Sequence, residues 1–288
     1  MLDFKNIKLI GSSHIAKASV KEIKEACVKL NPDIIALELD HTRLGTLVAE
    51  IDGKNSIKNN IKKGIMSKGK KKRRYNKSFS IIRKIGFNGF IFSLIGEYAE
   101  KKMGSIVGTK PGVDMLEAYK YAKKEKKMIA LVDQDIKKTL KNLSNTITWK
   151  EKWQFVKDLF SAFVLKKPSG DIDIKEFEGF DLNEVPKDEL VQKMMKQTKK
   201  HYPNLYKSLV EDRNNVMAKN LVILAKKYPE NTILAVVGAG HEKEMGKLMK
   251  KMYSKVELPA DKNPMVATKK IKVINDKNSF SYKIKVDN

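Results

Sequence analysis

The sequence predicts an α/β fold, close to the α+β class, in which helices flank a central β-sheet. Four apolar runs, at 7–10, 33–40, 127–133 and 232–237, have the length and continuity of strands that are covered on both faces. Segments with a helical period of about 3.6 residues separate these runs. Residues 271–286 instead alternate apolar and polar side chains around a turn, which is typical of a β-hairpin.

The composition allows one large domain and indicates a basic protein. The 288 residues are enough to bury a sizeable core, and 59 lysines and arginines against 34 acidic residues give a net charge of +25. Such an excess favours an anionic partner, although a general lysine bias or a warm habitat gives the same composition. The basic run Lys68–Arg74 is a candidate contact with nucleic acid or an anionic membrane surface, and a solvated insert is the alternative reading.

The single cysteine and the apolar stretches bear on location. Cys27 cannot form a disulfide within one chain, which favours a reducing compartment, and its place on an apolar helical stripe predicts a buried thiol. The start has no apolar signal region, and the longest apolar stretch, 86–96, falls short of the about 20 residues that span a bilayer. We therefore expect a cytoplasmic protein without a transmembrane segment, and association with a membrane surface is the alternative. The protein could also form homo-oligomers.

Two of the four histidines follow a strand and a glycine-containing turn. Gly11-Ser-Ser-His14 comes after the first apolar run, and Gly238-Ala-Gly-His241 comes after the last one. The glycines of the second motif are expected to let the backbone bend sharply between strand and helix. Ligands of α/β sheets bind at the carboxyl ends of strands. Both histidines are therefore candidate site residues.

Acidic residues follow the two middle strands. Glu38 lies inside an apolar run, where a carboxylate is costly unless it is paired, hydrogen-bonded or bound to metal, or else lies just beyond the buried part in solvent. Asp40 ends the same run, and Asp133 and Asp135 end the next one. If the strands are parallel neighbours, these acids share one rim with the two histidines, and Asp133 and Asp135 could instead cap the helix that follows them.

Two arginines and one further aspartate complete the candidate set. Arg43 could pair with Glu38. Arg213 falls on the apolar side of a helix expected over 206–224, so it needs a carboxylate or must extend to solvent. Its candidate partners are Glu38, Asp114, Asp133 and Asp135. Asp114, in the first turn of a helix, either stabilises the helix dipole or points into a cleft.

No stand-alone catalytic motif is complete. The segment from His241 to Met245 has a methionine where a zincin helix needs its second histidine, and the glycine pattern before it lacks the third glycine of a dinucleotide-binding turn. Two imidazoles and one to three carboxylates at one rim would instead suit a divalent metal such as zinc, manganese or cobalt. Trp149 and Trp153, on a helix expected over 148–165, are read as core or interface residues.

Six segments, in order, resemble the archaeal type of the TraB/PrgY (pheromone shutdown) family. They are Gly11-Ser-Ser-His-Ile15, Pro32-Asp-Ile-Ile-Ala-Leu-Glu-Leu-Asp40, Pro111-Gly-Val-Asp-Met115, Leu131-Val-Asp-Gln-Asp-Ile136, Glu211-Asp-Arg-Asn214 and Val236-Val-Gly-Ala-Gly-His241. More distantly, the family is similar to TIKI-type metalloproteases and to the erythromycin-esterase and ChaN-like fold. The resemblance implies a mixed sheet with helical insertions and a metal-dependent peptidase chemistry.

The resemblance also implies roles for individual residues. His14, His241 and Glu38 would hold the metal, Glu38 as ligand or general base, and Arg43 and Arg213 would support the reaction. The surrounding polar positions are Asp40, Asp114, Asp133, Asp135, Asp212 and Asn214. Three positions depart from the family pattern: Asp114 and Asp212 replace glutamates, and Gln134 replaces an arginine.

We therefore expect one domain at 1–255, with helical insertions at about 52–110 and 136–230, followed by a tail at 256–288 that carries the hairpin. The lead hypothesis for its function is a metal-dependent hydrolase that acts on a peptide. The alternatives are a non-catalytic protein that captures a peptide in the rim cleft, and a basic protein that binds nucleic acid or a membrane surface.

Overall fold

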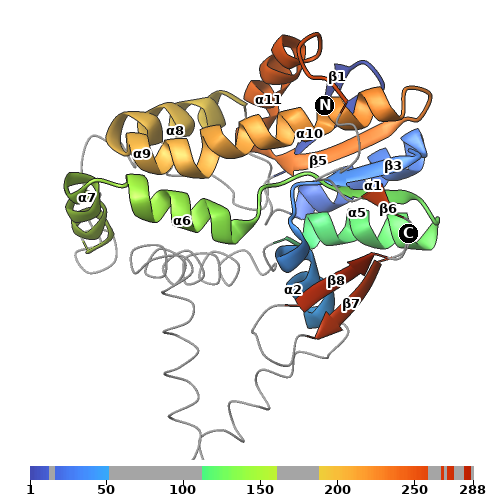
Figure 1. Cartoon of the computed structure of the whole chain (residues 1–288), viewed down its shortest axis with the longest axis horizontal. Coiled ribbons are helices and arrows are strands. Elements are labelled where there is room, and N and C mark those ends of the chain that lie inside the picture. The colour runs from blue at the N-terminus through green and yellow to red at the C-terminus, as the bar shows by residue number, and fades with distance from the viewer. Residues whose placement is uncertain are drawn as a thin grey trace, which may run out of the picture.

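A six-stranded mixed sheet with helices on both faces forms the centre of the molecule (Figure 1). The computed structural model describes residues 1–12, 17–51, 112–160, 188–258, 267–268, 271–275 and 282–286. Within these ranges the strand order is β1-β2-β5-β3-β4-β6. The predicted α/β class, with a mixed sheet, is confirmed.

The four apolar runs form the parallel centre of the sheet. In spatial order they are β2 (Ile7–Ser12), β5 (Ile233–Gly238), β3 (Ile34–Leu37) and β4 (Met128–Leu131). Their carboxyl ends therefore meet at one edge, as the sequence predicted. Two short antiparallel strands, β1 (Leu2–Phe4) and β6 (Ala267–Thr268), lie outside β2 and β4.

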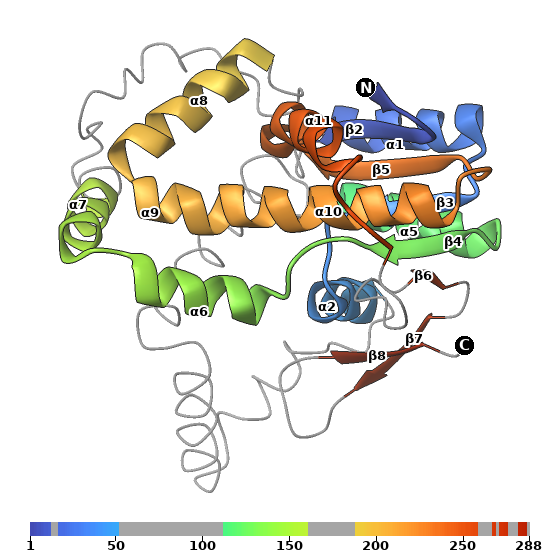
Figure 2. The same ribbon diagram turned by 45° about the horizontal axis from the view of Figure 1, so that its top comes forward.

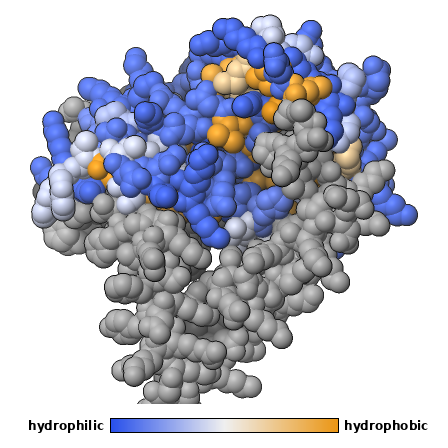
Figure 3. Space-filling view, viewed as in Figure 1, coloured by the Kyte–Doolittle hydropathy of each residue, from blue (hydrophilic) through white to orange (hydrophobic). Residues whose placement is uncertain are grey.

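Two layers of helices bury the two faces of the sheet. One face packs against α10 (Asp212–Lys227) and α11 (Ala239–Met252). The other packs against α1 (Lys17–Leu30), α2 (His41–Ile51) and α5 (Val113–Lys124). The predicted buried thiol is confirmed, because Cys27 of α1 is fully buried, and burial raises its pKa to about 11. In Figure 3 the described surface is mostly hydrophilic, with apolar atoms gathered over α10 and α11.

A group of helices extends beyond one end of the sheet, as both ribbon views show (Figures 1 and 2). These are α6 (Ile136–Thr146), α7 (Trp149–Phe160), α8 (Asp188–His201) and α9 (Pro203–Tyr206). A π-helical turn, Lys207–Glu211, joins α9 to α10. The sequence predicted one unbroken helix over 206–224, so this change of helix type is a correction.

The end of the chain forms the predicted hairpin. Strands β7 (Ile271–Asn275) and β8 (Tyr282–Val286) pair antiparallel and lie beside α2 (Figure 2). The tail also supplies β6 to the main sheet, which the sequence pattern did not predict. The basic run Lys68–Arg74 lies outside the described residues, as does the whole of the expected insertion at 52–110. Among the helices that are described, none is long and apolar enough to cross a bilayer.

Candidate active site

Three predicted site residues meet at the carboxyl ends of neighbouring strands. Glu38 follows β3 directly, Asp133 follows β4 by two residues, and His241 lies in the first turn of α11, after β5. The Glu38 and Asp133 side chains are only 2% and 1% exposed. The expected shared rim is therefore present for these residues, and the solvated alternative for Glu38 is wrong.

Arg213 joins the two carboxylates. Its Nη2 donates to Glu38 Oε1 and, over 2.8 Å, to Asp133 Oδ2, while its Nε donates to Asp133 Oδ1 over 3.0 Å. The Arg213 side chain is only 14% exposed, so the predicted alternative that it extends into solvent is wrong. Burial opposes the charge, but attraction to the two carboxylates outweighs it and raises the pKa of Arg213 further above its ordinary value.

Arg43 completes an ionic cluster of alternating sign. Its Nη1 lies 2.8 Å from Asp133 Oδ2 and 3.4 Å from the main-chain oxygen of Glu38. The expected pairing with the Glu38 carboxylate is therefore corrected, because Arg43 pairs with Asp133. Two carboxylates and two guanidinium groups leave the cluster, Glu38–Arg213–Asp133–Arg43, formally neutral. Arg43 has a side chain 34% exposed, so solvent reaches the cluster there.

Glu38 also connects the cluster to His241. Its Oε2 accepts the main-chain N–H of Gly238 over 2.6 Å, which ties β3 to the end of β5. Its Oε1 lies 3.4 Å from His241 Nε2. On the other side of the imidazole, Nδ1 lies 2.6 Å from Oδ1 of Asn214, which is 1% exposed. As the amide is placed, its oxygen accepts, which assigns the proton to Nδ1 and turns Nε2 toward Glu38, while Asn214 Nδ2 has no hydrogen-bond partner among the described residues.

The glycines before the histidines have a different role from the one expected. Gly238 has φ −63° and ψ 142°, a conformation open to any residue, so the sharp bend does not depend on its freedom. Gly11 matters for space, since a Cβ there would lie 3.0 Å from the Cα of Ala239. The glycine of the first motif therefore allows the start of α11 to approach the end of β2.

Two of the predicted acids serve helix starts. Asp40 accepts the main-chain N–H groups of Thr42 and Arg43 at the start of α2, and its other oxygen accepts that of Ile136 over 3.1 Å. Burial raises the pKa of Asp40, and these hydrogen bonds offset only part of the shift. Asp135 caps α6 through the N–H of Lys137. The predicted capping alternative therefore holds for Asp135, and Asp40 caps a helix as well, which the sequence pattern did not predict.

The other predicted residues occupy varied positions. Asp114, in the first turn of α5, accepts the hydroxyl of Ser12 at the end of β2, and both side chains are buried. Asp212 is partly exposed at the start of α10. His14 lies outside the described residues, so its distance to Glu38 and His241 stays a prediction. Sequence patterns did not single out Ser12 or the N–H of Gly238.

The π-helical turn lies directly before Arg213. Arg213 Nη1 donates to the carbonyl of Leu209 within that turn, over 3.2 Å. Ser208 in the same turn is fully buried and shares a 3.0 Å hydrogen bond with Thr146 of α6. Single π turns are frequent at functional sites, because they re-aim neighbouring side chains. Here the turn helps to fix the guanidinium between the two carboxylates.

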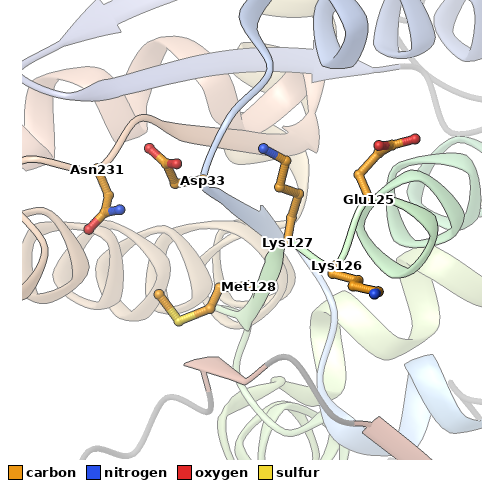
Figure 4. A pocket seen from close by; sticks show the side chains of 6 residues that line it. All are labelled: Asp33, Glu125, Lys126, Lys127, Met128 and Asn231. Carbon is orange, nitrogen blue, oxygen red and sulfur yellow. The ribbon is translucent and has the colours of Figure 1, made fainter.

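An open pocket lies at the opposite edge of the sheet (Figure 4). Its lining comes from the starts of β3 and β4 and from the loop before β5, and consists of Asp33, Glu125, Lys126, Lys127, Met128 and Asn231. It contains no member of the ionic cluster. The candidate site therefore rests on the convergence of side chains at the carboxyl edge.

Comparison with known proteins places the whole α/β unit in one family. The model of the TraB/PrgY/gumN family matches residues 3–255. The chain belongs to this family. An uncharacterised protein of the archaeon Methanocaldococcus jannaschii, MJ1365, is 31% identical over 247 residues, which cover 86% of this chain and 54% of the relative. The chain thus spans about half the length of the curated relative that it matches.

The expected metal can be tested against the donors of this TraB/PrgY/gumN chain. The 3.4 Å between His241 Nε2 and Glu38 Oε1 is close to the spacing of two donors on one tetrahedral metal with bonds of about 2.0–2.2 Å. Asp133 fits less well, because each of its oxygens already accepts two N–H groups: Oδ1 from Arg213 and Gln134, and Oδ2 from Arg213 and Arg43. No three metal-ligating side chains come together within the part of the chain that the structure describes, so a third protein ligand would have to come from outside it, where His14 lies.

Proposed function

We propose that this TraB/PrgY/gumN protein is a metal-dependent hydrolase of the peptidase type, with its centre at Glu38 and His241. The observation that carries the proposal is the restraint of the imidazole. Asn214 Oδ1 accepts from Nδ1 over 2.6 Å and thereby directs Nε2 at a buried carboxylate. Histidines that bind metals almost always donate their other N–H to a fixed acceptor in this way.

The residues divide the work of such a site. Glu38, His241 and His14 would hold the metal, which when bound supplies a polarised carbonyl or an activated water. Arg213 and the N–H of Gly238 hold the two oxygens of Glu38 in place, and Glu38 would serve either as a metal ligand or as the general base. Arg43 is the cluster's partly exposed cation, and a guanidinium there can donate to a substrate carboxylate or carbonyl.

The experiment measures metal content and peptide cleavage in the purified protein. The chain has four histidines, which supply their own controls. We expect wild type, His41→Ala and His201→Ala to retain metal and to cleave a quenched-fluorescent peptide library. We expect His14→Ala and His241→Ala to lose both properties. If all five proteins carry the same trace of metal and none cleaves peptide, the proposal is wrong.

Two alternative functions predict different results. A non-catalytic peptide-binding protein would retain peptides with an affinity that chelators do not change. A nucleic-acid-binding protein, which the net charge of +25 favours, would bind heparin with a steep dependence on salt. Its candidate contact, Lys68–Arg74, can be tested by replacing the lysines and arginines with glutamine.

A further inference from the structure

Helix α7 exposes both tryptophans of the protein. Trp149 is 73% and Trp153 is 69% exposed, and the sequence contains no third tryptophan. Residues four apart lie on the same side of a helix, so the two indoles form one aromatic surface. Of the two predicted alternatives, core and interface, the core is therefore wrong. Large aromatic side chains that gather on a protein surface often mark an interaction site.

The opposite side of α7 is firmly anchored. Glu151 is 5% exposed and accepts the main-chain N–H of Asn204 over 2.7 Å and its side-chain amide over 2.8 Å. Glu151 and Thr148 also form a reciprocal capping box, in which each side chain accepts the other's main-chain N–H. These contacts fix the rotation of α7 about its axis, so the tryptophans point outward by construction.

Basic residues surround the aromatic surface. Lys150 and Lys157 are exposed, and helical geometry places them within about 100° of the tryptophans around the axis. Lys152 lies beside the indole of Trp149, with its Nζ 4.6 Å from the ring centroid. Tryptophan seats at the boundary between lipid headgroups and acyl chains, and lysine binds anionic headgroups. Together they form the chemistry of a helix that lies on an acidic membrane.

We propose that the outer side of α7, formed by Trp149, Lys150, Trp153 and Lys157, docks the protein onto an anionic lipid surface. The location of the helix favours a membrane over a single-stranded nucleic acid. Proteins that stack bases on aromatic side chains do so inside a basic groove. Here α7 lies at one extremity of the described fold (Figure 1), and both of its indoles are exposed on the surface of the helix.

The two tryptophans give a direct measurement, because all indole fluorescence of the protein comes from α7. We expect the emission of wild type to shift to shorter wavelength with vesicles of phosphatidylglycerol and phosphatidylcholine. We expect no shift with phosphatidylcholine alone, and reversal of the shift at high salt. Trp149→Phe and Trp153→Phe each leave one indole, and both single variants should still show the shift.

Variants locate the contact by flotation with the same vesicles. Trp149→Ala/Trp153→Ala should lose co-flotation. Lys150→Gln/Lys157→Gln should weaken partitioning roughly 30-fold, since one basic residue beside an anionic surface contributes roughly fivefold. Lys219→Gln/Lys250→Gln removes the same charge from exposed positions on α10 and α11 and should partition nearly as wild type does.

Three results would overturn the proposal. The first is the absence of both an emission shift and co-flotation with anionic vesicles at low salt. The second is co-flotation without any shift, which would mean that another surface binds the lipid. The third is an emission shift caused by a single-stranded oligonucleotide but not by vesicles, which would assign the surface to nucleic acid. Circular dichroism of each variant confirms that the fold is retained.

Discussion

Arg213 and Asp133 are joined by two parallel hydrogen bonds, from Nε to Oδ1 over 3.0 Å and from Nη2 to Oδ2 over 2.8 Å. This bidentate pair links the start of α10 to the end of β4, 80 positions away in the sequence. Because Arg213 also donates to Glu38, one guanidinium holds together the ends of two strands. The pair thus stabilises the packing of α10 against the strand ends and also forms part of the candidate site.

Removing Arg213 should destabilise the protein strongly. Arg213→Met leaves two buried carboxylates without their shared partner, which costs about 3–5 kcal/mol of unfolding free energy. Arg43→Met serves as the matched control, because its side chain is 34% exposed and solvent screens its charge, so we expect at most about 1 kcal/mol. Urea unfolding at neutral pH measures both. Equal losses would show that burial does not set the strength of the cluster.

Asn214 should control the metal affinity that we propose for His241. Asn214→Ala removes the acceptor of Nδ1 and lets the imidazole rotate, so we expect metal affinity to fall about 10- to 100-fold. The neighbouring Asn215 is exposed, and Asn215→Ala is the control. Isothermal titration with zinc or manganese gives the affinities. Unchanged affinity in Asn214→Ala would mean that His241 binds no metal.

The two glycine-containing motifs should differ in their tolerance of alanine. Gly11→Ala places a Cβ 3.0 Å from the main chain of Ala239, which cannot move without shifting α11. Gly240→Ala meets the flexible end of Met195, its Cε 2.9 Å away, and this side chain can rotate. We expect Gly11→Ala to lower stability by about 1–3 kcal/mol and Gly240→Ala to cost less. Thermal unfolding of the two variants tests the order, and the reverse order would contradict it.

Glu151 should make stability depend on acid pH. Burial alone would raise its pKa, but the hydrogen bonds from Asn204 and Thr148 outweigh burial and lower the pKa of Glu151. A lower pKa in the folded state stabilises the fold above the unfolded pKa, and this contribution disappears as pH falls through the folded pKa. Acidification from about pH 6 to about pH 3 should therefore cost wild type more than Glu151→Gln. Parallel stability curves for the two proteins would refute this.

Much of the sheet could be predicted, because buried parallel strands leave a strong signal. The four apolar runs became β2, β3, β4 and β5, and their carboxyl ends meet as expected. The strands β1 and β6 are only three and two residues long, so hydrophobic alternation could not reveal them. The pairing of the edge strand β6 with β4 depends on a contact between residues far apart in the sequence, which local sequence patterns do not reveal.

The candidate site was predictable in residue type but less so in pairing. The need of Arg213 for a carboxylate followed from its place on an apolar side, but only the structure selects Glu38 and Asp133. Asp40 and Asp135 look equivalent to Asp133 in sequence, and they cap helices instead. Trp149 and Trp153 share a helical stripe, yet periodicity cannot distinguish a stripe that meets the core from one that faces solvent.

The π-helical turn at Lys207–Glu211 sets the phase between two neighbouring helical segments. Each residue rotates an α-helix by about 100°, so one residue more or less turns everything beyond it. Ser208 can reach Thr146 of α6 while Asn214, six positions later, faces His241. Deleting one residue from this turn would rotate Asn214 relative to Ser208 by about 100°. Either the contact of Ser208 with Thr146 or the contact of Asn214 with His241 would then be lost. This single π-helical turn thus sets the rotation of α10 relative to the preceding segment, so that one side contacts α6 and the other contacts the strand ends.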